Sequence, residues 1–432
     1  MYDLTIIGAG WAGYSAALRA KELGKNVCLI EKSDIGGTCL NRGCIPTKFL
    51  VHAAKQISSF KKPNSFGISV SSFNFDFKTT INNKNELIKK LRASMENELK
   101  SKKIDVVKSH AKIVSPNQIK LDSSLIETKN IIVATGSIAI ELPDLKFDGA
   151  KFISSDDLLD LSVIPKSLLI VGGGVIGCEF ATIFNTLGTS VTIVELLERI
   201  LFNEDREVSK KLELILKKKG VAIHTGRRAQ DLNLDEFEKI LICVGRAPDT
   251  KDLGLDEIGV KKEKNRIVIN EFLETNVEGI YAAGDCIGGY QLAHVAAYEG
   301  RLVVNNIFGQ KNKADYSAVP NAIFTDPEIA SIGLKEEEAH NKNIEIKIGK
   351  FSFLGLGLAH ILGQTDGFIK IIADRPSERI LGASLFGEKA TELVSCLGLA
   401  VKNELRLSQI NKTLFAHPTI SESIQEASLR AL

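Results

Sequence analysis

The stretch LTIIGAGWAGYSAALRAKELGKNVCLIE, residues 4–31, decides the fold. An apolar strand runs into a glycine-rich turn, a helical segment follows, and a second apolar strand ends in an acid. This order predicts a βαβ unit that binds a dinucleotide. Gly8 would permit the tight turn, Gly10 the close approach of a pyrophosphate, and Gly13 the packing of helix on strand. Glu31 is expected to accept hydrogen bonds from an adenosine ribose.

The same unit returns as SLLIVGGGVIGCEFATIFNTLGTSVTIVE, residues 167–195. Gly172, Gly174 and Gly177 take the places of the three turn glycines, and Glu195 ends the second strand at the same spacing. One such motif is weak support, because a glycine-rich turn in an unrelated α/β protein looks alike. Two full copies predict an α/β chain with two Rossmann-like dinucleotide-binding domains.

The second unit is expected to prefer NAD to NADP. The two residues after Glu195 are Leu196 and Leu197, so a 2′-phosphate would meet a carboxylate with no arginine next to it in the sequence. Arg199 follows shortly after and is interpreted as a solvated loop residue.

The composition bounds the remaining choices. A chain of 432 residues is too long for one core, so two or three domains are expected. The 55 basic and 53 acidic residues nearly cancel, which gives no reason to expect nucleic acid or an anionic membrane as partner. The sequence starts without a leader-like segment and has no apolar run of membrane length. We therefore expect a cytoplasmic protein, or a matrix protein if a leader has been removed.

A close cysteine pair lies in GGTCLNRGCIPTK, residues 36–48. A helix is expected to begin near Cys44, with Pro46 in its first turn, where a missing N–H costs little. A helix N-terminus stabilises a thiolate. Lys48 lies one turn further on, so its ammonium would share a face with the thiolate of Cys44.

Three interpretations of Cys39 and Cys44 are open. Half a zinc site would need two more ligands, and the sequence has no second CxxC and no HxxxH, so no metal is predicted. Two structural cysteines would suit apolar surroundings, whereas this stretch is polar and rich in glycine. The third interpretation is a redox-active dithiol or disulfide beside a flavin, which suits a reducing compartment.

The cysteine stretch is similar to the active-site signature of the class I pyridine nucleotide-disulfide oxidoreductases, a family of flavoproteins. Other segments resemble that family in its own order over nearly the whole chain. They are ATGS (134–137), ICVGRAPDT (242–250), GIYAAGDC (279–286), PNAIFTDPEIASIG (320–333) and FAHPTISE (415–422). The resemblance implies one FAD in the first nucleotide site and NAD in the second.

The resemblance also implies further site residues. Besides the first glycine turn, those expected to hold FAD are Lys48, Thr135, Gly136 and Asp285. Gly245 and Glu179 are expected at the NAD site. Glu179 has a second interpretation, as an ordinary acid in the first turn of a helix, where the dipole favours it.

The family's domain order implies two Rossmann-like domains and a C-terminal α+β dimerisation domain. The expected boundaries are residues 1–142 for the first FAD segment, 143–255 for the NAD domain, 256–318 for the second FAD segment and 319–432 for the interface domain.

Within the family, the sequence most resembles the dihydrolipoamide dehydrogenases. Leu196 and Leu197 stand where glutathione-type reductases carry arginines, and the C-terminus lacks the second cysteine pair of mercuric reductases. The resemblance implies an enzyme that oxidises protein-bound dihydrolipoyl groups and reduces NAD+.

The implied mechanism assigns a role to each catalytic residue. A substrate thiol attacks Cys39, Cys44 remains as a thiolate against the flavin, and Lys48 stabilises negative charge. His417 takes the thiol proton, and Glu422 orients the imidazole. In the family the histidine comes from the second subunit, so a homodimer is expected.

The expected partner is a lipoyl-domain protein of a 2-oxoacid dehydrogenase complex, of the glycine cleavage system or of a specialised kind. Two alternatives stay open: another disulfide reductase of the family that uses NAD(P)H, and an idle flavoprotein that acts as a scaffold or subunit.

Three departures from the family are visible in the sequence. The connection RRAQDLNLDEF, residues 227–237, is shorter than the family's meander of strands, so a hairpin is expected to be missing. Phe415 replaces a histidine that is usual two positions before His417, and Asp249 stands where asparagine is common.

Overall fold

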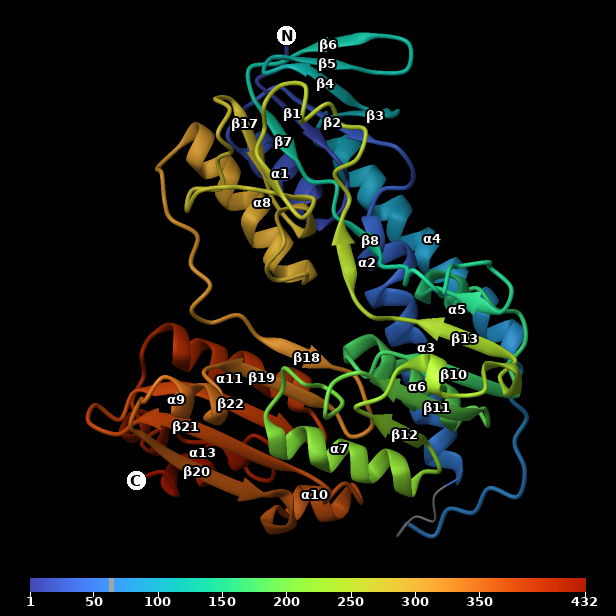
Figure 1. Cartoon of the computed structure of the whole chain (residues 1–432). Helices are drawn as coiled ribbons and strands as arrows, with labels where there is room; N and C mark the ends of the chain where they lie inside the picture. The colour runs from blue at the N-terminus through green and yellow to red at the C-terminus, as the bar shows by residue number, and fades with distance from the viewer. Residues whose placement is uncertain (62–65) are drawn as a thin grey trace.

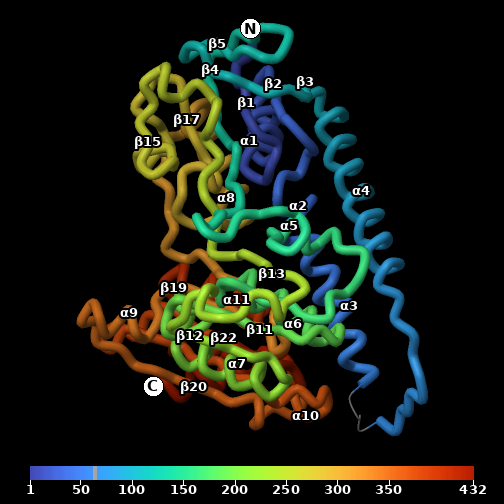
Figure 2. The backbone as a smooth tube through the Cα atoms, turned by 45° about the vertical axis from the view of Figure 1, so that its right-hand side comes forward, coloured from blue at the N-terminus to red at the C-terminus, as the bar shows by residue number. Residues whose placement is uncertain are grey.

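The computed structural model describes residues 1–61 and 66–432, and it contains three five-stranded sheets. Figure 1 shows the N-terminal sheet at one end of the molecule and the other two at the opposite end. Figure 2 shows the same separation from a second direction, in which the second and C-terminal units overlap at the lower end.

The first sheet is parallel, with the strand order β17-β7-β1-β2-β3. Its strands are β1 (Leu4–Ile7), β2 (Val27–Glu31), β3 (Asp105–Lys108), β7 (Ile131–Val133) and β17 (Ile280–Ala282). β1 pairs in parallel on both sides and all four of its residues are buried, which explains its continuous apolar sequence. Helices α1 (Trp11–Glu22) and α8 (Ala293–Phe308) pack against each other. β17 and α8 thus return the chain to the first nucleotide unit.

The second sheet is also parallel, in the order β12-β11-β10-β13-β9. Its strands are β9 (Phe152–Ile153), β10 (Ser167–Val171), β11 (Ser190–Glu195), β12 (Ala222–Thr225) and β13 (Lys239–Ile242). The helices of this unit are α5 (Ser155–Leu159), α6 (Val175–Thr186) and α7 (Arg206–Lys218). Between β12 and β13 the chain forms only two 3-10 turns, Ala229–Asp231 and Leu234–Glu236, so this connection contains no hairpin, as predicted.

The third sheet is antiparallel, in the order β18-β19-β22-β21-β20. Its strands are β18 (Asn321–Ile323), β19 (Ile329–Gly333), β20 (Ile346–Ser352), β21 (Phe368–Asp374) and β22 (Ile380–Phe386). The helices of this unit are α9 (Glu336–Asn341), α10 (Gly357–Ile361), α11 (Ala390–Lys402), α12 (Leu407–Asn411) and α13 (Glu422–Leu429). α11 packs on β19 and β22, and α13 packs on β20 and β21. The prediction of two dinucleotide-type α/β units followed by an α+β unit is confirmed.

Three helices lie between β2 and β3 in the chain: α2 (Gly37–Arg42), α3 (Cys44–Lys61) and α4 (Phe77–Ser101). α3 packs against both α4 and α6, so it spans the two nucleotide units. α4 begins at Phe77, in a polar stretch of the chain. Asp76 caps it by accepting a hydrogen bond from the backbone N–H of Thr79.

Short elements complete the chain. They are the meander β4 (Lys112–Ser115), β5 (Gln118–Lys120) and β6 (Leu125–Glu127), the pair β8 (Ser137–Ala139) with β14 (Arg246–Pro248), the pair β15 (Lys262–Glu263) with β16 (Arg266–Ile267), and 3-10 turns at Asp285–Ile287 and Phe353–Gly355. The β8–β14 pair joins the segment that follows β7 in the first unit to the segment that follows β13 in the second. Across the described residues, no helix combines the length and the apolar character needed to cross a membrane.

Candidate active site

A cavity of about 1770 Å³ lies where the two nucleotide units and α3 meet. It is lined by residues of both glycine turns, by both cysteines, and by the segments that follow β7 and β13. The predicted residues among its lining are Gly8, Gly10, Glu31, Cys39, Cys44, Lys48, Thr135, Gly136, Gly172, Gly174, Glu179, Glu195, Gly245 and Asp285. The structure therefore brings nearly all of the predicted site residues into one space.

The first glycine turn has no room for a side chain at Gly8 or at Gly13. Gly8 has φ +104°, and a Cβ there would lie 2.3 Å from the carbonyl oxygen of Ala134. A Cβ on Gly13 would lie 1.8 Å from the carbonyl oxygen of Gly8. The backbone N–H of Ala9 donates to Oε2 of Glu31 at 2.7 Å. The acid thus also holds the turn in shape.

The second glycine turn repeats this geometry atom for atom. Gly172 has φ +115°, and its Cβ would lie 2.6 Å from the carbonyl oxygen of Cys243. A Cβ on Gly177 would lie 2.0 Å from the carbonyl oxygen of Gly172. The backbone N–H of Gly173 donates to Oε2 of Glu195 at 2.6 Å. The repeated contacts show that the two sequence units form the same cradle.

The middle glycines differ from the others, because the protein leaves space beside them. Gly10 and Gly174 precede α1 and α6 in extended conformations with negative φ, so neither needs glycine for its backbone angles. A Cβ on Gly174 would meet no protein atom, and one on Gly10 only the Cα of Gly37 at 3.9 Å. Open space at a helix N-terminus fits a ligand phosphate that approaches the backbone. Both cradles therefore fit dinucleotides.

The remaining residues predicted for FAD form a polar rim on the first unit. Asp285 accepts a hydrogen bond from Oγ of Ser137 at 2.5 Å, and Nε of Arg246 donates to the same Oγ at 2.9 Å. Oγ1 of Thr135 donates to the carbonyl oxygen of Asp249 at 2.6 Å. Arg246, which the sequence interpretation did not assign, orients Ser137 toward Asp285.

The cysteine pair is held as two interacting thiols, Cys39 in α2 and Cys44 at the first position of α3. The hydrogen bond from Cys39, with help from the charge of Lys48, lowers the pKa of Cys44 to about 7. The same hydrogen bond and burial raise the pKa of Cys39. The reduced pair thus favours a thiolate at Cys44 and a neutral thiol at Cys39.

Lys48 makes a contact that the sequence interpretation missed. Its Nζ lies 2.9 Å and 3.0 Å from the two carboxylate oxygens of Glu179, a side chain that is only 4% exposed. The backbone N–H of Phe324 donates to Glu179 at 2.9 Å, and the Lys48 ammonium lies 4.7 Å from the centre of the Phe324 ring. Glu179 is the fifth residue of α6, so its interpretation as a first-turn helix acid is wrong.

His417 and Glu422 form a pair, but they do not line the cavity. Nδ1 of His417 lies 2.8 Å from Oε1 of Glu422, and the backbone N–H of Thr419 donates to Oε2 at 2.8 Å. Both hydrogen bonds lower the pKa of Glu422, and the one from the Thr419 backbone has the larger effect. The His417 side chain is 77% exposed. Within one chain, His417 and the cysteines therefore belong to different surfaces.

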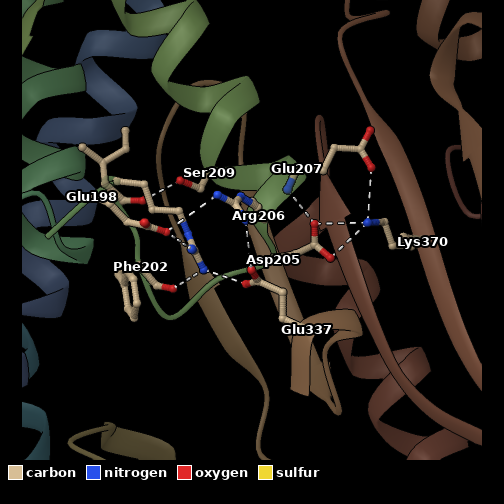
Figure 3. A network of polar contacts seen from close by, with 10 residues as sticks. Glu198, Phe202, Asp205, Arg206, Glu207, Ser209, Glu337 and Lys370 are labelled. Carbon is tan, nitrogen blue, oxygen red and sulfur yellow. Dashed lines mark hydrogen bonds and ion pairs between the residues drawn. The ribbon is translucent and has the colours of Figure 1, made fainter. Parts of the chain in front are cut away.

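Arg199 is not the solvated loop residue that the sequence suggested. Its guanidinium donates to Glu337 at 2.7 Å and to the carbonyl oxygen of Phe202 at 2.9 Å. Figure 3 shows Phe202 and Glu337 within a polar network, which also includes Asp205 and Lys370, between the second and third sheets. Arg199 is buried in this network and forms ion pairs with the carboxylates of Glu198 and Glu337.

Two other arginines, Arg227 and Arg228, line the cavity instead. They follow β12, which lies beside β11 with Thr225 opposite Glu195. The sequence interpretation looked for arginines only next to Glu195 along the chain and missed them. The parallel order of β11 and β12 was the signal that could have found them, because residues after neighbouring parallel strands meet at one edge.

The matches to known proteins cover both parts of the chain. Residues 2–300 match the family described as pyridine nucleotide-disulphide oxidoreductase, and residues 319–428 match its dimerisation domain. Dihydrolipoyl dehydrogenases of Chlamydia pneumoniae and Bacillus subtilis are 39% and 36% identical to the chain. Each match covers 100% of this chain and 97% or 98% of the relative.

Solved structures agree with this fold. LpdA of Mycobacterium tuberculosis matches with a TM-score of 0.92 at 26% identity. RclA of Escherichia coli, a HOCl-induced flavoprotein disulfide reductase, matches with a TM-score of 0.89 at 30% identity. Both matches cover 99% of each chain. With two cradles, a dithiol between them and relatives matched over their full length, the chain belongs to the pyridine nucleotide-disulphide oxidoreductase family.

Proposed function

We propose that the chain is a homodimeric dihydrolipoyl dehydrogenase that oxidises protein-bound dihydrolipoyl groups to the cyclic disulfide and reduces NAD+. The observation that carries this proposal is the position of Cys39, Cys44 and Lys48, which line one cavity together with two dinucleotide cradles. FAD and NAD are the cofactors of this family, and both cradles fit them. Bound FAD supplies two-electron transfer between the dithiol and the nicotinamide.

The residues of the chain carry the sulfur chemistry. Starting from a Cys39–Cys44 disulfide, one dihydrolipoyl sulfur attacks Cys39, forms a mixed disulfide and expels Cys44 as a thiolate. The second dihydrolipoyl sulfur then attacks the first, closes the lipoyl ring and releases Cys39. His417 accepts a substrate thiol proton, and Glu422 stabilises the charged imidazole. The low pKa of Cys44 makes it the better leaving group.

A second subunit is needed to complete this site. His417 is exposed and lies outside the cavity of its own chain. The C-terminal unit also exposes large apolar side chains, as expected of a dimerisation surface. They include Leu354, Ile361, Leu362, Leu399, Leu414, Leu429 and Leu432. We infer that His417 of the partner subunit serves Cys39.

The expected substrate is a lipoyl domain of a 2-oxoacid dehydrogenase complex, of the glycine cleavage system or of a specialised carrier. We further propose the domain boundaries at residues 142, 255 and 318, which separate the three sheets and leave β17 with the first one. Phe415, at the family's usual histidine, packs against the core of the third sheet.

Steady-state assays test the proposal. Dihydrolipoamide with NAD+ is expected to turn over rapidly, and glutathione disulfide with NADPH is expected to be a poor pair. The opposite preference would favour a disulfide reductase, the class to which the RclA relative belongs. Inactivity with both pairs, despite bound FAD, would favour an idle scaffold.

A further inference from the structure

Arg227 and Arg228 lie at the adenosine end of the second cradle. The backbone N–H of Arg227 donates to the carbonyl oxygen of Glu195 at 3.1 Å, and that of Gly226 donates to Leu197 at 2.9 Å. Both arginines line the cavity together with Glu195 and Leu197. The acid expected to bind the adenosine ribose therefore has two arginines as its neighbours across the sheet edge.

The short connection after β12 fixes these arginines in place. Ala229, only 3% exposed, belongs to a small core that contains Val194 and Ile242 of the neighbouring strands. The backbone N–H of Arg228 donates to the carboxylate of Asp231 at 2.9 Å. This hydrogen bond caps the first 3-10 turn, which begins at Ala229. Because no hairpin intervenes between β12 and β13, the segment at the nucleotide site is short and anchored.

The charges around the ribose position leave the arginines available for an anion. Both side chains are exposed, and no carboxylate of the described residues forms an ion pair with either guanidinium, in contrast to Arg199. Glu195 already accepts backbone N–H groups on both oxygens, from Gly173 at 2.6 Å and from Leu197 at 2.8 Å. These donors partly offset its charge. A guanidinium binds phosphate with two parallel hydrogen bonds.

We propose that the second cradle also binds 2′-phosphorylated dinucleotides, and that Arg227 and Arg228 are the residues that hold the 2′-phosphate. A carboxylate at the ribose ordinarily rejects this phosphate, and an arginine nearby accommodates it. Here both occur at one site. The inference rests on the proposed function only in assigning this cradle to the nicotinamide nucleotide.

Equilibrium binding to the FAD-loaded, oxidised dimer tests the proposal without turnover. Isothermal titration compares NAD+ with NADP+, and adenosine 5′-monophosphate with adenosine 2′,5′-bisphosphate, which isolate the adenosine end. We expect wild-type Kd values for NADP+ within about tenfold of those for NAD+, because guanidinium–phosphate bonds offset repulsion by Glu195.

In the double variant Arg227→Ala/Arg228→Ala, we expect weaker binding of both 2′-phosphorylated ligands. Their Kd values should rise at least about tenfold more than those of NAD+ and adenosine 5′-monophosphate, in line with the strength of charge-assisted hydrogen bonds. The control is Lys210→Gln, which removes one exposed charge from α7, outside the cavity. This control is expected to change neither the ratio of the Kd values for NADP+ and NAD+ nor the ratio for the two adenosine nucleotides. FAD absorbance and the dimer mass report folding of each variant.

Two results would overturn the inference. One is a wild-type Kd for NADP+ more than about a hundredfold above that for NAD+, the discrimination expected when a phosphate meets an uncompensated carboxylate. The other is an equal loss of both ligand classes in the double variant. Neither result bears on dihydrolipoamide oxidation, so failure here is distinguishable from failure of the proposed function.

Discussion

Lys48 and Glu179 are 131 residues apart in the chain, yet their charged groups lie 2.9 Å apart beside the cysteine pair. The contact joins α3, which begins at Cys44, to α6, which follows the glycine turn of the second cradle. It therefore connects the segment that carries the dithiol to the second nucleotide unit through one ion pair. Because Lys48 lowers and Glu179 raises the pKa of Cys44, the pair also adjusts the thiolate.

Replacing Lys48 with methionine is expected to raise the pKa of Cys44, whereas Glu179→Gln is expected to lower it. In the reduced protein, site-resolved alkylation as a function of pH measures both shifts, because only the thiolate reacts. Lys48→Met also leaves a buried carboxylate without its partner. Since Lys48 is 31% exposed, we expect a loss of about 2 kcal/mol in the free energy of unfolding, below the cost for a fully buried pair.

Lys55→Met is the matched control for this prediction. Lys55 lies on the same helix and pairs with Glu328 at 2.6 Å, with a similar exposed fraction of 28%. It is expected to lower stability without moving the alkylation profile of Cys44. A change in that profile as large as the one from Lys48→Met would show that the effect comes from packing of α3 and not from local charge.

The two single cysteine variants are expected to differ in colour when FAD is bound. Cys39→Ser keeps the thiolate of Cys44 and a hydroxyl that can donate to it, so a thiolate-to-flavin absorbance band should be present. The band should strengthen as the pH rises, because the thiolate forms by deprotonation. Cys44→Ser should lack it. A band that persists in Cys44→Ser would contradict the assignment of Cys44 as the thiolate next to the flavin.

Much of this site follows from short-range sequence patterns. The two cradles are visible because turn, helix and strand lie within one βαβ unit, and the start of α3 follows from its proline and its helix N-terminus. Lys48 and Glu179 could be chosen separately but not paired, since their contact depends on how α3 packs on α6. Arg227 was missed for the same reason, because only the order of strands places it beside Glu195.

The errors of the sequence interpretation also have physical causes. Arg199 reads as a loop residue, but Glu337 of the third unit covers it, and no local pattern reveals a charge partner so far along the chain. Glu179 reads as a first-turn acid because it lies just past Gly177, but α6 begins at Val175, which makes Glu179 its fifth residue.

Gly172→Ala is expected to damage the second cradle specifically. Its Cβ would lie 2.6 Å from a backbone oxygen at a φ of +115°, so both overlap and backbone strain act together. We expect a stability loss of about 3 kcal/mol and weakened NAD+ binding. Gly220→Ala is the control, with φ +92° and no atom within 4 Å, and should cost about 1 kcal/mol with NAD+ affinity unchanged. Thermal unfolding and titration with NAD+ measure both effects.

A heterodimer of two inactive subunits decides whether the base acts across the interface. One subunit carries Cys44→Ser and the other carries His417→Gln, and each homodimer is expected to lose at least about a hundredfold in kcat, the usual contribution of general base catalysis or more. If His417 serves the partner's cysteines, the heterodimer contains one intact site, because the Cys44→Ser subunit still supplies its histidine. Doubly tagged heterodimer should then show about half of wild-type activity, since one of two sites works. If the histidine served its own chain, both sites would be broken and the heterodimer would be as inactive as either homodimer.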